Sequence, residues 1–306
     1  MTYKQIEVYA PASIANLGPG FDVFGIALDN MGDILRLEIS SDREISVSMR
    51  GLDVGSIPLD ARANSAGAVL RQALELTEVD HGFRVEIEKG VPQGKGLGSS
   101  GASAAAAAYA ANELLELGLS RKELIALAAV GEAAVAGSAH ADNVSASLLG
   151  GFIMVGADFD AISLEPPCIE LVIAAPKVHY ENKTRLARSL LPKLVELKDV
   201  VRNVGNASRM AAAVALKDPV LFGRSICDCL IEPRRAEMIP NFWKVKEEAL
   251  KAGAYGCSIA GGGPSVFAVG KDSAPIGDAM AKAFSEAGVE CDVYFTRPSP
   301  MGVRVI

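Results

Sequence analysis

Residues 92–109 read PQGKGLGSSGASAAAAAY, and this stretch decides how the rest of the chain is interpreted. Glycines and two adjacent serines lead directly into a block of alanines. Glycine lets backbone N–H groups approach a ligand closely, and alanine is the strongest helix former. A helix that begins at Ser99 or Ser100 adds its unpaired N–H groups and the positive end of its dipole. The stretch therefore predicts an anion site, most naturally for phosphates, where the two serine hydroxyls can donate to a phosphate oxygen or ligate Mg²⁺.

Other phosphate-binding patterns fit this stretch less well. It lacks the Walker A spacing G-x-x-x-x-G-K-[ST] but matches G-x-G-x-x-G at Gly96, Gly98 and Gly101. Dinucleotide-binding folds place a fully buried parallel strand before that pattern and an acidic residue at the end of the next strand. Here the preceding segment alternates polar and apolar residues, and the downstream acids Glu113 and Glu116 fall in a predicted helix. A glycine turn before a packed helix is the structural alternative.

Two more glycine-containing clusters lie far away in the sequence. Residues 10–28 read APASIANLGPGFDVFGIAL, where the polar segment 16–22 is equally consistent with a hairpin turn and with a site. Residues 258–269 read SIAGGGPSVFAV, and Gly261, Gly262 and Gly263 predict close backbone approach to a ligand or to another loop. Three such clusters in one chain indicate a phosphate-bearing ligand.

Length and composition set the frame for this site. A chain of 306 residues exceeds one comfortable hydrophobic core, so we expect two domains, residues 1–163 and 164–306, joined near 160–168. A net charge of −7 argues against a nucleic-acid partner. No apolar run reaches the roughly 18–20 residues that cross a bilayer, and the N-terminus lacks the apolar segment of a signal peptide. We therefore expect a cytoplasmic protein without a membrane partner.

The five cysteines show no zinc or disulfide spacing, so buried reduced thiols are expected.

Hydrophobic periodicity predicts a mixture of strands and helices in both halves. Strands are expected at residues 3–13, 33–40, 43–51, 82–92, 148–159 and 167–176, as two strands around a glycine turn in 255–270, and at 291–297. Helices are expected near 64–79, 100–118, 120–137, 183–198, 203–216, 219–230, 240–252 and 275–287, with Ser120 as an N-cap. Periodicity alone therefore supports mixed α and β structure in two units.

Together, the three clusters resemble the signature motifs of the GHMP small-molecule kinases, and residues 11–28 are similar to the N-terminal motif of the homoserine kinase family. The segments GSAHADNVSASLLGG (137–151) and EPRRAEMIPNF (232–242) support this narrower resemblance, although Ala141 and Ser265 replace the family's usual proline and threonine. The resemblance implies the α+β class and a two-domain GHMP kinase fold. Its N-terminal ATP-binding domain would be like ribosomal S5 domain 2, and its C-terminal domain would be a ferredoxin-like α/β sandwich. Related kinases are often homodimers.

The same resemblance implies ATP and Mg²⁺ as cofactors. The implied ATP-binding residues are Pro92, Gly94, Lys95, Gly96, Leu97, Gly98, Ser99, Ser100, Gly101 and, outside the loop, Asn64. Ser100 and Glu132 are the implied Mg²⁺ ligands. Glu132 stands among small apolar residues, where a lone carboxylate is costly unless it meets a cation; an exposed helix face is the alternative.

The acceptor implied by the resemblance is L-homoserine, which is phosphorylated on its side-chain hydroxyl. The implied acceptor-binding residues are Asn16, Asp22, Asp142, Asn143, Thr184, Arg188 and Arg235, with His140 either orienting its neighbours or serving a structural role. Arginine suits the carboxylate because its planar fork makes paired hydrogen bonds, and Arg235 matches the family best. Asp142 either takes the hydroxyl proton or only binds the acceptor. The alternative activities are a sister GHMP kinase for shikimate, mevalonate or a sugar, and a non-catalytic nucleotide-binding module.

Overall fold

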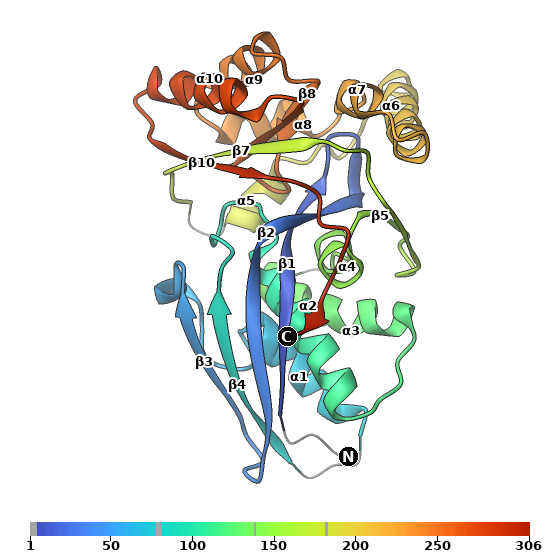
Figure 1. Cartoon of the computed structure of the whole chain (residues 1–306), viewed down its shortest axis with the longest axis vertical. Coiled ribbons are helices and arrows are strands. Elements are labelled where there is room, and N and C mark those ends of the chain that lie inside the picture. Colours follow the sequence, from blue (N-terminus) through green and yellow to red (C-terminus); the bar gives the residue numbers. More distant parts are fainter. Residues whose placement is uncertain (1–4, 78–80, 138, 181–182) are drawn as a thin grey trace.

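A computed structural model describes residues 5–77, 81–137, 139–180 and 183–306, which form two stacked units (Figure 1). The first unit is built on a seven-stranded sheet in the order β11-β1-β2-β4-β3, with β5 paired to β2 and β6 paired to β5. Its strands are β1 (Gln5–Asn16), β2 (Gly20–Ser40), β3 (Ile45–Gly51), β4 (Gly82–Lys89), β5 (Phe152–Val155), β6 (Ala161–Leu164) and β11 (Arg304–Val305). Its helices are α1 (Ser65–Glu75), α2 (Ser99–Leu114), α3 (Arg121–Ala136) and α4 (Asp142–Leu149).

Helix α2 forms the centre of this unit. Its alanines are all buried, and the helix packs against β1, β2, α1, α3 and α4 at once. Alanine makes this possible because its small side chain combines high helix propensity with close approach of neighbouring backbones. The predicted helices at 100–118 and 120–137 are confirmed as α2 and α3, and Ser120 caps α3 in a reciprocal bond with Glu123.

The second unit is a four-stranded antiparallel sheet in the order β10-β7-β9-β8. Its strands are β7 (Glu170–Pro176), β8 (Gly256–Ile259), β9 (Val266–Gly270) and β10 (Cys291–Thr296). Its helices are α5 (Lys183–Ser189), α6 (Leu197–Ala215), α7 (Pro219–Arg224), α8 (Glu232–Arg235), α9 (Phe242–Lys251) and α10 (Ser273–Ser285). The order of strands and helices, with α9 leading into β8 and α10 into β10, is the ferredoxin-like β-α-β-β-α-β arrangement.

The sheet of the second unit is buried on both faces. Val172 and Ala174 of β7 belong to an apolar cluster with α9 and α10, which lie above the sheet in Figure 1. Leu171 and Ile173, which alternate with them, belong instead to the large core shared with the first unit. One core therefore runs through both units and joins them.

Several predicted elements differ in the structure. The helix predicted at 183–198 is wrong, because α5 ends at Ser189 and α6 begins at Leu197; Pro192 disfavours helical geometry in the residue before it. The helix predicted at 219–230 ends at Arg224. Residues 161–164, expected in a connection, form β6. The short elements α4, α8 and β11 were not predicted.

The end of the chain returns to the first unit. β11 pairs with β1, and the backbones of Ser299 and Ala27 are joined by an N–H···O bond of 2.9 Å. The domain boundary between residues 163 and 164 stays a prediction. β11 follows that boundary in the sequence but pairs with a strand of the first unit. All five cysteines are unpaired; only Cys257 is buried, so the expectation of buried thiols is confirmed for that residue alone. Among the described residues, no helix is both long and apolar enough to cross a membrane.

Candidate active site

The glycine-rich loop, residues 92–101, connects β4 to α2. It is held between β1 and the C-terminal glycine loop, which lies within residues 258–269. Gly94, Gly96 and Gly98 have φ values of 70°, 79° and 68°, in the left-handed region that favours glycine. A Cβ atom on Gly96 would lie 2.2 Å from the carbonyl oxygen of Ala260, and one on Gly98 would lie 2.2 Å from Ser13 Oγ. The close backbone approach predicted for 258–269 is therefore made to the loop at residues 92–101.

The loop ends where α2 begins. The first bond within α2 runs from Ala102 N to Gly98 O at 2.8 Å, so the amides of Ser99, Ser100 and Gly101 have no acceptor inside the helix. The Ser99 hydroxyl donates to Val91 O at 3.0 Å and the residue is only 9% exposed. Ser99 therefore offers a backbone N–H rather than its hydroxyl, whereas Ser100 is partly exposed at the helix start.

Two of the residues expected to bind ATP have protein partners. Asn64 is 1% exposed and caps α1: its Oδ1 accepts from Ala66 N at 3.0 Å and Gly67 N at 3.2 Å, and its Nδ2 donates to Pro58 O at 2.8 Å. These bonds give the Asn64 amide a structural role, and its expected contact with ATP stays a prediction. Lys95 is half-buried, and its Nζ donates to Pro176 O at the end of β7 at 2.7 Å.

Asp142 stands at the first position of α4 and is 3% exposed. Its Oδ1 accepts from the backbone N of Asn143 at 2.7 Å. Burial, followed by the nearby charge of Asp22, raises the pKa of Asp142 to about 7, and Glu132 contributes in the same direction. The Asn143 side chain accepts from Ser13 Oγ at 2.9 Å, which fixes the start of α4 against β1.

Three side chains from separate segments meet near Asp142. Asp22, near the start of β2 with φ 55°, lies 3.5 Å from His140 Nδ1 and 3.6 Å from the Arg188 guanidinium. Arg188 also contacts His140 Nδ1 at 3.1 Å. Burial lowers the pKa of His140, so a neutral ring is favoured beside these charged groups. Thr184, expected in the same group, has a side chain outside the described residues.

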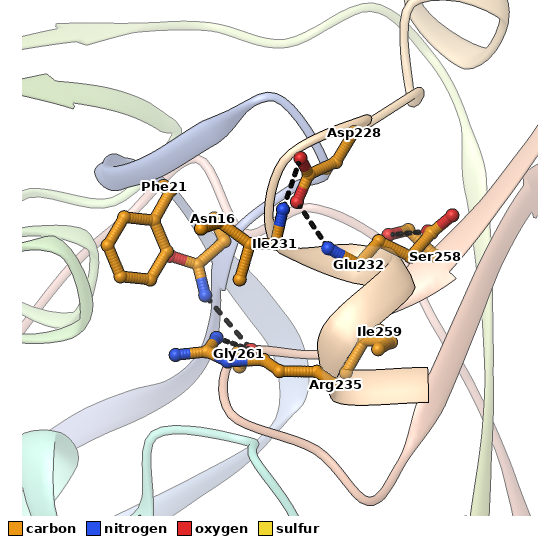
Figure 2. A pocket seen from close by; sticks show the side chains of 10 residues that line it. Asn16, Phe21, Asp228, Ile231, Glu232, Arg235, Ser258, Ile259 and Gly261 are labelled. Carbon is orange, nitrogen blue, oxygen red and sulfur yellow. Dashed lines mark hydrogen bonds between the residues drawn. The ribbon is translucent and has the colours of Figure 1, made fainter. Parts of the chain in front are cut away.

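Arg235 lies in the wall of a small pocket where both units meet (Figure 2). It is 6% exposed, and its NH1 donates to Gly261 O at 3.0 Å, the same oxygen that accepts from Asn16 Nδ2 at 2.9 Å. The guanidinium carbon is 5.1 Å from the centre of the Phe21 ring. The hairpin turn and the C-terminal glycine loop are thus joined at one carbonyl, with the arginine fixed beside them.

The single turn of α8 that carries Arg235 is held at its N-terminal end. The Asp228 carboxylate accepts from the backbone N of Leu230, Ile231 and Glu232, at 2.7, 2.9 and 2.8 Å. The Glu232 carboxylate accepts from Ser258 Oγ at 2.5 Å. Figure 2 shows the bonds that Asp228 accepts from Ile231 and Glu232 and the bond between Glu232 and Ser258. These contacts were not predicted, because Asp228 lies outside the motifs and no role was assigned to Glu232 within the segment 232–242.

Glu132 is buried on α3, only 8% exposed, and so is not on the exposed helix face that was the alternative. It contributes to the pKa values of both Asp142 and Lys89. Among the described residues, no group of three or more His, Cys, Asp or Glu side chains is arranged to hold a metal. A cation site built from Glu132 and Ser100 would therefore need further ligands from a bound nucleotide or water.

A buried ion pair behind the glycine-rich loop was also missed. Lys89 of β4 is 3% exposed and Asp33 of β2 is 0% exposed, and their charged groups are in direct contact. The signal was available in the sequence. Lys89 continues the inward positions Phe83, Val85 and Ile87 of an alternating strand, which places a charged residue on the buried face.

Known proteins match both the sequence and the fold. The family models described as GHMP kinases N terminal domain and GHMP kinases C terminal match residues 63–151 and 210–289. Curated homoserine kinases of Natronomonas pharaonis and Methanocella arvoryzae are 45% and 42% identical to this chain; the matches cover 95% and 98% of it and 97% of each relative. The crystal structure of homoserine kinase from Cytophaga hutchinsonii has a TM-score of 0.90 and 39% identity, with coverage of 100% of this chain and 98% of that one. The two-domain GHMP kinase fold is confirmed, and because identity and fold agree over nearly the whole length, the chain belongs to the homoserine kinase family of GHMP kinases.

Proposed function

We propose that this chain transfers the terminal phosphoryl group of ATP to the side-chain hydroxyl of L-homoserine, giving ADP and O-phospho-L-homoserine for threonine biosynthesis. The observation that carries the proposal is the position of Arg235. It is a buried arginine beside the hairpin turn and the glycine loop, and that glycine loop packs directly on the glycine-rich loop at residues 92–101. An acceptor with a carboxylate suits such a fork, whereas a sugar has no matching group.

The glycine-rich loop supplies the phosphate site in this proposal. Backbone amides from Gly96 to Gly101 would bind the phosphates, supported by the start of α2. Ser100 and Glu132 would hold Mg²⁺, because a hydroxyl and a buried carboxylate are the hard oxygen ligands that this ion prefers. When bound, the ion would neutralise charge on the phosphates. Lys95 already donates to Pro176, so we assign it to joining the two units rather than to the phosphates.

The acceptor would lie between Arg235 and Asp142. Arg235 would bind the carboxylate, while Asp22 would bind the ammonium and Arg188 would compensate the charge of Asp22. We assign Asn16 and Asn143 to holding the site together, since both have protein partners. Of the two roles left open for Asp142, its pKa near 7 favours the proton acceptor, because a base is most effective when its pKa is close to the working pH. The hydroxyl proton would pass to Asp142 as the oxygen bonds to the terminal phosphorus and ADP leaves.

The test is ADP release with Mg²⁺-ATP and a panel of alcohols: L-homoserine, L-threonine, mevalonate, shikimate and galactose. We expect turnover on homoserine to exceed that on every other alcohol by orders of magnitude. Turnover on mevalonate, shikimate or galactose without turnover on homoserine would instead assign a sister activity of the GHMP kinases. The cytoplasmic location and the homodimer stay predictions, and size-exclusion chromatography tests the latter.

A further inference from the structure

The ammonium of Lys89 lies in the protein interior behind the loop at residues 92–101. Its Nζ contacts the Asp33 carboxylate, Ser99 O at 2.7 Å and Ser103 Oγ at 2.9 Å. An ammonium has three protons, so these acceptors account for all of them. Burial lowers the pKa of Lys89 and the Asp33 charge raises it, so the carboxylate supports the charged form of the lysine.

Asp33 connects the Lys89 ammonium to Gly90 and Val91, where the loop begins. Its Oδ1 accepts from Gly90 N at 3.1 Å and Val91 N at 3.3 Å, while its Oδ2 accepts from Ser103 Oγ at 2.7 Å. The residues that enter the loop and the first turns of α2 are therefore tied to one ion pair on the sheet. Replacing such a buried pair by apolar residues often costs no stability, so stability alone does not account for it.

The contact with Ser99 O affects the peptide group that faces the phosphate site. That carbonyl belongs to the same peptide unit as the N–H of Ser100, one of the amides left without an acceptor at the start of α2. A cation on the carbonyl oxygen polarises the peptide and makes its N–H a stronger donor. The polarisation matters most in the low-dielectric interior, where Lys89 lies.

We propose that Lys89 is a positioning residue for phosphoryl transfer: with Asp33 it fixes the first turn of α2 and polarises the Ser99–Ser100 peptide toward the phosphates of ATP. This inference rests on the proposed use of ATP but not on the identity of the acceptor. Lys89 itself does not touch the nucleotide, because its three protons are directed at protein acceptors. Its contribution reaches the phosphates through the backbone.

The experiment combines Lys89→Met with Asp33→Asn. The double variant removes both charges but keeps an amide oxygen for the backbone of Gly90 and Val91, and thermal unfolding checks that it folds. Ser103→Ala is a second, milder variant that keeps the ion pair. The matched control is Lys122→Met, which removes a lysine from an exposed pair with Asp158.

Calorimetric titration with ATP and with adenosine, without any acceptor, separates a phosphate effect from a general one. We expect the double variant to bind ATP about tenfold more weakly, with adenosine affinity within about twofold of the parent, and kcat to fall about 100-fold. Ser103→Ala should lose ATP affinity a few-fold and the control none. A folded double variant with parental ATP affinity and kcat, or with equal losses for ATP and adenosine, would overturn the role of Lys89. If the parent protein itself fails to bind ATP, the proposed function fails and this inference with it.

Discussion

Replacing Asp142 by asparagine should make the protein more stable above neutral pH. The buried carboxyl has its pKa raised from 3.8 to about 7, whereas asparagine carries no charge at any pH. Between these two values the native state keeps a proton that the unfolded state has released, so this group's contribution to stability falls as pH rises toward 7. From pH 5 to pH 8 the native group gains its charge, and about two pH units at 1.36 kcal/mol each give roughly 3 kcal/mol.

The assay is urea unfolding of the parent and Asp142→Asn at pH 5, 6, 7 and 8. Relative to its value at pH 5, the difference in the free energy of unfolding should shift in favour of the variant by roughly 3 kcal/mol at pH 8. Asp42→Asn, on an exposed turn, is the matched control and should show no such trend. A pH-independent difference for Asp142→Asn would refute the argument from burial.

The kinetics of the same variant decide what Asp142 does. If Asp142 accepts the hydroxyl proton, the variant should lose roughly 10²–10⁴-fold in kcat, and parental kcat/KM should rise with pH toward a plateau above about 7. A raised KM for the acceptor with unchanged kcat would show that Asp142 only binds.

Other substitutions test the rest of the site. Arg235→Lys should raise the acceptor KM at least about tenfold while leaving ATP binding unchanged, since lysine lacks the planar fork; equal losses for both substrates would count against the assignment. Gly96→Ala should lower both stability and ATP affinity, because its Cβ would meet Ala260 O at 2.2 Å. Gly94→Ala, with no atom within 4 Å of its Cβ, should show a much smaller loss of each. Scanning calorimetry measures the stability, and titration calorimetry measures the ATP affinity. Ser120→Ala removes a capping box far from the site and should cost about 1 kcal/mol in urea unfolding without changing kcat; a change in turnover would be unexpected.

The sequence predicts most of the regular structure because the periodicities are strong. The alternation of Phe83, Val85 and Ile87 is buried as expected, and the alanine-rich segments form the two helices predicted for them. The short elements escape prediction because they depend on distant contacts. α8 is a single turn held by Asp228, and β11 has only two residues paired to β1. A pattern of two to four residues in the sequence does not predict these distant contacts.

The site is predictable where backbone geometry requires glycine and less so where side chains meet from distant segments. The three glycine clusters meet as one site, because Gly96 and Gly98 can approach Ala260 and Ser13 only without side chains. The sequence could not show that Asn64 caps α1, since an asparagine suits a helix cap as well as a contact with ATP. It also could not show that Lys89 pairs with Asp33, although the alternation of the strand places this lysine on the buried face.

The return of β11 to β1 has a consequence for synthesis of the protein. A nascent chain emerges N-terminus first, so Val8 and Tyr9 on the outer edge of β1 gain their strand partners only after Arg304 and Val305 have been made. Until then, that edge presents open N–H and C=O groups to other chains, which is a known hazard for aggregation. A product that stops before residue 297 would keep every residue of the candidate site but would leave Val8 and Tyr9 permanently without their partners in β11.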